Sequence, residues 1–587
     1  MKKVGSLALA LALCLGLAVP AAAADTARAG TGNTISTGGN ITAAITADGS
    51  LWMWGLNDEG QLGNGGVGND VYGPSERSIQ TVPVRVMSDV VSVSCGTHHA
   101  AAIKTDGSLW TWGWGVDGAL ADGIGDYDHH VVRPQKVMDG VAAVSCGTND
   151  TAILKTDGSL WMCGYNNYGE FGNGVPEQAV TTPIKVMDGV AAVSCEGSVT
   201  AILKQDGSLW MCGLNLTGQI GNGGGGNDIC LVSYKYEWPI QTVPVRVLDD
   251  VQYVHCGSAH VAAIKNDGSL WMWGANGASQ LGRDGGNDVR IHYGYNDIVL
   301  DETPIQTVPI RVLEDVATVA CGSGYTMAVR SDGSLWNCGS DQDGRLGNGD
   351  AYGQSTFTKV MDGVAAVSGS GNALALKTDG TLMSWGPNLY GQVGNGHWGY
   401  GQSVQTPVQV LTGLAVPELP SPPVAGFQDV RERDYFADAV VWAKERGVTS
   451  GTSATTFSPA ATVTRAEAVT FLWRAAGSPQ PASATSPFAD VTDAGAYYYD
   501  AVLWAAEQGI TGGVGNGQFG LDGTLTYDQI LAMLCRAAGE TAAGGDWSAA
   551  AVNWAAANGL TDGLTVSAKG SCPRADVVYC LWKQMAQ

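Results

Sequence analysis

Positive charge is scarce in this sequence: 31 lysines and arginines stand against 55 aspartates and glutamates, which gives a formal net charge of −24. Charged residues of either sign make up only 15% of the chain. A surface of this sign repels the phosphate backbone of nucleic acids and the headgroups of anionic lipids. We therefore expect no nucleic-acid partner.

Long apolar runs are missing after the first 24 residues. Two lysines at positions 2 and 3 precede an apolar run over residues 7–19, and small residues follow up to position 24. This order is typical of a secretory signal peptide, and the run is short for the alternative, an uncleaved membrane anchor. We assign residues 1–24 to the signal and expect an exported chain with no membrane span after cleavage.

The motifs of the common catalytic sites are missing as well. The chain has no GxSxG elbow, no HExxH, no P-loop, and only eight histidines. The segment "GDYDHH" (residues 125–130) could ligate a metal, although an exposed polar loop is the simpler interpretation. We expect neither an enzyme nor a cofactor.

The 13 cysteines lack the dense spacing of a small disulfide scaffold. Five recur at one position of an internal repeat, and three more lie 17 residues after such a position. This leaves three pairings open: Cys146–Cys163, Cys195–Cys212 and Cys321–Cys338. Buried free thiols that act as small apolar residues are the simpler interpretation.

Glycine is abundant, with 83 residues, and it accompanies a repeat built around tryptophan. The segment "DGSLWMWG" occupies residues 48–55 and returns at residues 267–274. Seven units share an Asp-Gly pair, which begins at Asp48, Asp106, Asp157, Asp206, Asp267, Asp332 and Asp379. A period of about fifty residues with variable inserts is typical of a propeller or a solenoid.

Each unit predicts four short strands. A strand such as "VAAVSCG" precedes a second such as "AAIK", a two-residue Asp-Gly turn, the strand "SLWMWG" and, after a glycine-rich turn, a strand such as "TPIKVM". Trp52 and Trp54 share one face of the third strand, while Leu51 and Met53 share the other. Both faces are apolar, which predicts stacked blades with both tryptophans as filling between them.

These units resemble the regulator-of-chromosome-condensation repeat family, a seven-bladed β-propeller. The family pattern "CGxxH" stands at Cys95–His99 and Cys256–His260, and "WGxNxxGQLGxG" stands at Trp54–Gly65. The resemblance covers residues 33–414 and implies an all-β seven-bladed propeller in which both histidines pack between blades. The founding family member is a nuclear nucleotide-exchange factor, a function that we do not expect of an acidic, exported chain.

Long inserts fall at equivalent positions of three units, over residues 66–81, 224–242 and 283–307. In a closed ring, such loops lie on one face. The inserts and the last unit carry the aromatic residues that we predict as a rim for an extracellular protein or glycan: Tyr72, Tyr234, Tyr236, Trp238, Tyr293, Tyr295, Trp398 and Tyr400. Alternatively, the loops cover one another.

One insert reads "GGVGNDVYG" (residues 65–73), which fits the calcium-binding nonapeptide GGxGxDxUx. That motif completes its calcium sites only when tandem copies stack, and the copies here lie in different units. We therefore expect no calcium at this segment.

A proline-rich linker, residues 415–426, precedes a region with helical patterning. Three units follow, over about residues 427–477, 488–539 and 546–587, and each contains "AVxWA" and a helix-ending glycine. In "TRAE" of the first unit, Thr464 and Glu467 form a capping box. Arg465 lies in the first turn of that helix, where a cation opposes the helix dipole, so it is a candidate for function.

These units resemble S-layer homology repeats, with "FxDV" at Phe427–Val430 and Phe488–Val491. The resemblance covers residues 427–587 and implies a separate all-α domain that binds a secondary cell-wall polymer, an anionic glycan. The binding set that it implies is Arg465, Arg574, Thr464, Glu467 and Trp442.

An arginine beside a helix N-terminus fits a carboxylate ligand, although the arginines could instead pair with nearby acids. We favour Arg465 as the ligand-binding residue, followed by Arg574 in the third unit. The second unit has Tyr527 at this position, so its groove is expected to bind weakly.

The sequence thus predicts a secreted protein on the wall of a Gram-positive bacterium, with a propeller presented for binding or adhesion. One alternative is an inhibitor of a secreted enzyme, since secreted propellers of this repeat family can inhibit β-lactamases, and another is a glycan-active enzyme. An acidic, aromatic pocket at the central channel would favour the enzyme, whereas a broad aromatic rim would favour binding.

Overall fold

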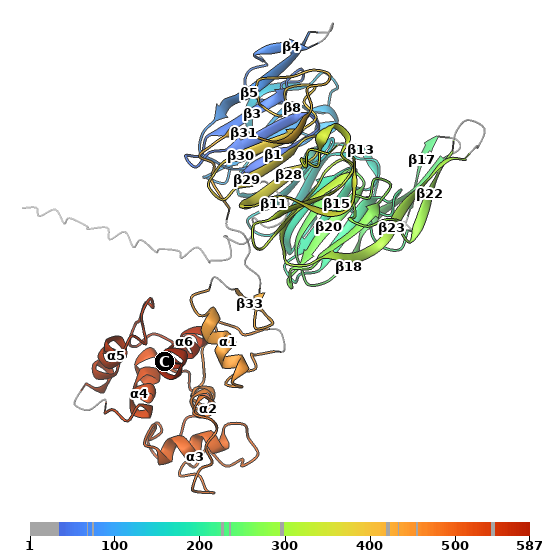
Figure 1. The fold of residues 1–587 in the computed structure, drawn as a ribbon. Coiled ribbons are helices and arrows are strands. Elements are labelled where there is room, and N and C mark those ends of the chain that lie inside the picture. The colour runs from blue at the N-terminus through green and yellow to red at the C-terminus, as the bar shows by residue number, and fades with distance from the viewer. Residues whose placement is uncertain are drawn as a thin grey trace, which may run out of the picture. The chain divides into compact units, whose positions relative to one another are not determined.

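The structure is a computed structural model that describes residues 34–66, 68–72, 76–224, 228–233, 236–293, 299–350, 352–417, 423–431, 434–453, 456–541 and 546–586. The chain divides near residue 420 into two compact units, a β-propeller and a helical domain (Figure 1). The predicted signal (1–24) lies outside the described residues, as does the middle of the predicted linker (418–422).

The propeller consists of seven antiparallel sheets, each formed by one sequence repeat, so the predicted fold is confirmed. Blades 1 to 3 contain β1 (Ile35–Thr37), β2 (Ile41–Ile45), β3 (Leu51–Leu56) and β5 (Arg77–Met87); β6 (Val90–Cys95), β7 (His99–Lys104), β8 (Leu109–Trp114) and β9 (His130–Met138); and β10 (Val141–Cys146), β11 (Asp150–Lys155), β12 (Leu160–Asn166) and β13 (Glu177–Met187).

Blades 4 and 5 contain β14 (Val190–Glu196), β15 (Val199–Lys204), β16 (Leu209–Leu214) and β18 (Tyr236–Leu248); and β19 (Val251–Cys256), β20 (His260–Lys265), β21 (Leu270–Ala275) and β23 (Val299–Leu313). Blades 6 and 7 contain β24 (Val316–Cys321), β25 (Tyr325–Arg330), β26 (Leu335–Gly339) and β27 (Gln354–Met361); and β28 (Val364–Gly369), β29 (Ala373–Lys377), β30 (Leu382–Gly386) and β31 (Val404–Leu411).

The first strand of each blade lies at the centre of the ring, in contact with the first strands of both neighbours. Polar side chains on these strands accept hydrogen bonds from backbone N–H groups of the following blade: Ser36 from Cys95, Ser94 from Cys146, Ser145 from Cys195, Ser194 from Cys256, and His255 from Cys321. Ser368 of blade 7 accepts from the Thr37 N–H of blade 1 at 3.0 Å. Side chains therefore join the last blade to the first.

The second tryptophan of a unit is buried between blades, as predicted. The indole Nε1–H of Trp54, Trp112, Trp273 or Trp385 donates to a backbone carbonyl of the preceding blade at 2.9 to 3.0 Å. Cysteine replaces this tryptophan in three blades. Its thiol keeps the inter-blade bond in two of them, because Cys212 Sγ donates to Glu170 O and Cys338 Sγ to Gln280 O.

The first tryptophan, present in six of the seven units, is only half-buried, but in blades 1 to 4 it packs against the apolar cluster between its own blade and the preceding one, as predicted. In blades 2 to 5 its indole N–H donates to the serine of the Asp-Gly-Ser turn at 2.9 Å, and a lysine from the second strand lies over the ring at 5.0 to 5.3 Å, as in Lys104 over Trp110. The residue lies near the strand end, where the amphipathic lysine also covers the ring.

The Asp-Gly hairpins hold three-residue loops instead of the predicted two. In blade 1 the Thr46 N–H donates to Ser50 O at 3.0 Å, and only Gly49 has a positive φ, of 78°. The Asp48 carboxylate accepts from Ser50 N and Thr46 Oγ1. Glycine therefore supplies the left-handed position, while aspartate fixes the turn through its side chain.

Three inserts form fifth strands rather than the predicted loops. The strands β4 (Asp70–Tyr72), β17 (Asp228–Ser233) and β22 (Asp288–Tyr293) pair antiparallel with the last strands of blades 1, 4 and 5. Figure 1 shows β17, β22 and β23 extending outward from the ring. Regular backbone pairing thus continues into the inserts.

The cysteines whose side chains the structure describes are free and buried, including both members of the three candidate pairs. Burial raises the pKa of the Cys95 and Cys256 thiols to about 12, so both stay protonated. The described thiols therefore act as small apolar residues.

The helical domain contains a two-stranded sheet, β32 (Pro423–Val424) and β33 (Phe427–Arg431), and six helices: α1 (Ala437–Glu445), α2 (Arg465–Ala475), α3 (Tyr499–Glu507), α4 (Tyr527–Ala537), α5 (Trp547–Ala557) and α6 (Arg574–Met585). The first helix of each repeat packs on the second helix of the preceding one: α3 on α2, α5 on α4, and α1 on α6. The three repeats therefore close into a cyclic arrangement around one apolar core.

The aspartate of "FxDV" has a structural role in the first two repeats. Both Asp429 oxygens accept backbone N–H groups, from Phe457 at 2.8 Å and Ser458 at 2.6 Å. Asp490 accepts from Phe519 and Gly520, both at 2.7 Å. The motif thus fixes the segment that leads into the second helix.

We expect Trp54→Ala to lower the stability of the propeller by about 3–5 kcal/mol, because it removes a fully buried ring. Trp52→Ala, on the same strand, should lower it much less, because Trp52 is half-buried. Calorimetric unfolding of both variants checks this, and equal losses would contradict the different burial of the two tryptophans.

Burial raises the pKa of Asp150, between blades 3 and 4, to about 7, so the folded chain takes up a proton that the unfolded chain releases. The stability of the chain relative to Asp150→Asn should therefore fall as the pH rises from about 4 to about 7. Thermal unfolding across this range measures the difference, with the exposed Asp188→Asn as control. A constant difference would contradict the protonated state.

Candidate functional site

The second helices of the helical domain begin with their backbone donors already occupied. The N–H groups of Arg465 and Ala466, which start α2, donate to carbonyls of the second repeat at 2.9 and 3.2 Å. The starts of α4 and α6 repeat this arrangement with the third and first repeats. The next donor of α2, Glu467 N–H, is capped by Thr464 Oγ1 at 3.2 Å. The side chains at the helix starts therefore remain as the groups that could recognise a ligand.

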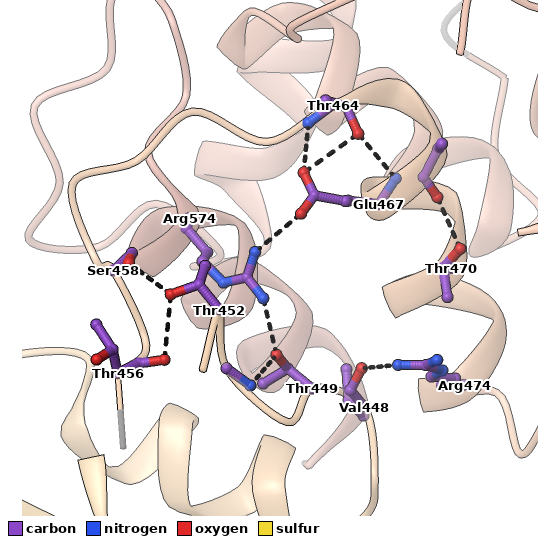
Figure 2. Close-up of polar contacts among 12 residues, drawn as sticks. Val448, Thr449, Thr452, Thr456, Ser458, Thr464, Glu467, Thr470, Arg474 and Arg574 are labelled. Atoms are coloured by element: carbon purple, nitrogen blue, oxygen red, sulfur yellow. Dashed lines mark hydrogen bonds and ion pairs between the residues drawn. The ribbon is translucent and has the colours of Figure 1, made fainter. Parts of the chain in front are cut away.

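The first residue of each such helix faces the third residue of the next repeat's helix. Figure 2 shows this for Arg574, whose Nη1 donates to Glu467 Oε1 at 3.2 Å and whose Nη2 donates to Thr449 Oγ1 at 3.0 Å. The guanidinium also lies over Phe471, at 4.8 Å from the ring centre, and Arg574 is only 4% exposed. Arg574 therefore pairs with a nearby acid, which the sequence analysis gave as the alternative to ligand binding.

Tyr527 occupies the equivalent place at the start of α4. Its hydroxyl donates to Asp576 Oδ2, and Tyr435 of the first repeat donates to Asp576 Oδ1. These contacts occupy both carboxylate oxygens of Asp576.

Arg465 occupies the third such place and has a different environment. It lines a groove of about 350 Å³, together with Thr511, Gln529, Arg536 and Trp547. Thr511 and Gln529 stand where Thr449 and Glu467 stand around Arg574. No hydrogen bond or ion pair joins the Arg465 guanidinium to any residue within the described ranges, and burial lowers its pKa.

The remaining predicted residues of this domain have structural contacts. Thr464 and Glu467 form the expected capping box. Trp442 lies on α1 and is 9% exposed, and it is not among the residues that line the groove around Arg465. Sequence reasoning missed Gln529, Arg536 and Trp547, because they belong to the second and third repeats.

The predicted aromatic rim of the propeller is only partly described. Tyr72, Tyr236 and Tyr293 belong to β4, β18 and β22, while Tyr234 and Tyr295 lie outside the described residues. Trp238 stacks on Tyr168 of blade 3, with ring centres 6.0 Å apart, so for this residue the alternative of mutual covering applies. Trp398 is half-buried and Tyr400 is 86% exposed.

Two exposed tyrosines were missed. Tyr127 is 72% exposed and Tyr352 is 80% exposed, and both lie between the third and fourth strands of a blade, as the inserts do. Tyr352 borders an open groove of about 740 Å³, which Asp341, Gln342, Gln354 and Gln405 also line. Both tyrosines follow the third strand of a repeat, as the inserts do, and this position in the sequence would have identified them as candidates for the aromatic rim.

The central channel is narrow and polar. A cavity of about 40 Å³ lies among the first strands, and serines and cysteines line it with Glu196 and His255. Ligand sites for a sugar or a drug-sized molecule take about 300–1,000 Å³. The acidic, aromatic pocket that would favour an enzyme is therefore not found at this channel among the described residues.

The candidate metal motifs have other roles. Asn69 of "GGVGNDVYG" accepts from the Thr81 N–H at 2.8 Å and donates to Thr81 Oγ1, which fixes the start of the fifth strand. In "GDYDHH", His129 lies 2.6 Å from Asp122, and His130 lies 2.9 Å from Glu59. Over the described ranges, no three His, Cys, Asp or Glu side chains gather as metal ligands would.

The histidines of "CGxxH" pack between blades, as predicted. His99 Nε2 lies 2.9 Å from Thr151 Oγ1 of the next blade, and His260 Nε2 lies 2.9 Å from Thr326 Oγ1. Burial lowers the pKa of His99 to about 4 and that of His260 to about 3, so both rings are neutral near pH 7.

Comparison with protein families agrees with this architecture. The model of the RCC1-like domain matches residues 17–290 and 140–433. The chain belongs to the RCC1-like domain family. The model of the S-layer homology domain matches residues 426–469 and 487–530, which are the two repeats that carry "FxDV". The S-layer homology repeats indicate cell-wall anchoring, and the RCC1-like propeller indicates protein binding.

The curated relatives of the RCC1-like propeller include a receptor and ubiquitin-protein ligases. The ultraviolet-B receptor UVR8 of Arabidopsis thaliana is 27% identical over 337 residues, which are 56% of this chain and 58% of the receptor. The probable E3 ubiquitin-protein ligase HERC6 of Homo sapiens is 30% identical over 303 residues, which are 50% of this chain and 22% of the ligase. The chain thus spans less than two thirds of either relative.

Among solved structures, Prp20p of Saccharomyces cerevisiae is similar in fold, with a TM-score of 0.51 and 18% identity. The similarity covers 67% of this chain and 90% of Prp20p. Among the residues that the structure describes, no helix combines the length and the apolar character that a membrane span requires.

Arg574→Gln should destabilise the helical domain by about 2 kcal/mol, because it removes charge-assisted hydrogen bonds to Glu467 and Thr449. Thermal unfolding followed by the helical circular-dichroism signal measures the loss, with the exposed Arg446→Gln as control. Equal unfolding midpoints for the two variants would show that Arg574 has no structural role.

Proposed function

We propose that this chain is an exported protein of a bacterial cell surface, which the helical domain holds non-covalently on an anionic wall polymer. The propeller then presents its exposed face to an extracellular protein or glycan. The observation that carries the anchoring function is the groove around Arg465, where a half-buried cation has no acidic partner among the described residues.

The groove suits an acidic sugar. Its volume of about 350 Å³ lies in the range of small-ligand sites. A guanidinium donates two parallel hydrogen bonds to a carboxylate, and these bonds are strong where water is partly excluded. Trp547 in the groove wall is 38% exposed and offers a surface for a sugar ring.

Binding at the propeller is supported by its exposed aromatic residues. Tyr127, Tyr352 and Tyr400 all lie between the third and fourth strands of their blades, which places them on one face of a ring. Tyrosine gives a large contact area at a small loss of conformational entropy. Inhibition of a secreted enzyme would be one form of such protein binding.

Co-sedimentation of the full-length mature chain with purified Gram-positive wall tests the anchor, with wall stripped of its secondary polymer as a reference. Arg465→Gln should weaken binding by about ten- to hundredfold, the effect of losing charge-assisted hydrogen bonds. Arg446→Gln removes the same charge from an exposed site of the domain and should bind normally.

The fraction of Arg574→Gln that stays folded should also bind normally, because Arg574 is buried against Glu467. Unchanged binding by Arg465→Gln would contradict the assigned groove. Equal binding to stripped and intact wall would contradict the polymer as the ligand.

A further inference from the structure

The three equivalent places in the helical domain differ in the residue that faces the helix start. Arg574 faces the carboxylate of Glu467, and Tyr527 faces that of Asp576. Arg465 shares its groove with Gln529, which is neutral. Among the three places, the Arg465 groove is the one in which an arginine shares its surroundings with an uncharged amide, that of Gln529.

The capping box explains why a glutamine in place of a glutamate at this position matters. Glu467 uses Oε2 to accept the Thr464 N–H at 2.9 Å, and its other oxygen, Oε1, accepts from Arg574. Gln529 uses its Oε1 in the same way, for the Thr526 N–H at 3.2 Å. The remaining group of Gln529 is an NH₂, which is a donor and cannot accept from the Arg465 guanidinium.

We infer that Gln529 is the residue that keeps the Arg465 groove open to an anionic ligand. The inference rests on the proposed anchoring function and goes beyond it. A glutamate at this position would keep the helix cap and would form with Arg465 the ion pair that Glu467 forms with Arg574. That internal carboxylate would occupy the guanidinium in place of the ligand's carboxylate.

The inference also predicts how many polymer-binding sites the helical domain has. The contacts of Arg574 with Glu467 and of Tyr527 with Asp576 already fill two of the three equivalent places within the described residues. The domain therefore engages the polymer through one groove. Its binding should follow a single-site curve, without the gain that several linked sites would give.

The test is Gln529→Glu in the full-length chain, measured by the same co-sedimentation with wall. Wall binding should fall about tenfold or more, while the unfolding midpoint of the helical domain stays the same or rises, because the new ion pair lies within the fold. Gln508→Glu adds the same charge at an exposed position of the domain and should change neither quantity.

Gln529→Met provides a second variant, because it removes the amide but stays neutral and should keep most of the wall binding. If Gln529→Met loses binding as fully as Gln529→Glu does, Gln529 contacts the ligand and the inference is overturned.

Arg465→Gln separates failure of the inference from failure of the proposed function. If Gln529→Glu binds wall normally while Arg465→Gln does not, the anchoring groove stands and the role of Gln529 is overturned. If both variants bind normally, the assignment of the groove falls and the role of Gln529 falls with it.

Discussion

Polar groups at the ends of each repeat are satisfied by a neighbouring repeat, and both domains depend on this pairing. In the propeller, indole N–H groups and first-strand serines bridge successive blades, and Ser368 closes the ring onto Thr37. In the helical domain, the starts of α2, α4 and α6 donate to carbonyls of another repeat. Since a buried unpaired polar group costs about 1–3 kcal/mol, no repeat is expected to be stable outside its closed ring.

This dependence explains which substitutions the repeats tolerate. Cysteine replaces a buried tryptophan where its thiol still reaches the carbonyl of the preceding blade, as at Cys212 and Cys338. Proline replaces the capping threonine before α6, where Ala461 O still accepts the Arg574 N–H. A repeat can therefore change its side chains as long as the contact with its neighbour is made by another group.

The candidate site arises where one repeat departs from the pairing of the others. The chain is strongly acidic, so a wall polymer with carboxylates meets repulsion at long range, which salt screens beyond about 8–10 Å. Attraction must then come from a few cations at contact distance. Arg465 and Arg536 line one groove, whereas Lys569, which lies over Trp547 in its wall, is paired with Asp528. The groove thus holds two arginines in a small area of an otherwise acidic chain.

By itself the sequence determined the seven blades, the three helical units, the capping boxes and the packing histidines, because turn chemistry and apolar periodicity are local. It misassigned the inserts, whose pairing depends on neighbouring strands. It also placed Arg574 beside Arg465 as a ligand-binding residue. Only the tertiary structure showed that the surroundings of these arginines differ, because ring closure, rather than spacing along the chain, sets Glu467 against Arg574 and brings Gln529 into the groove that Arg465 lines.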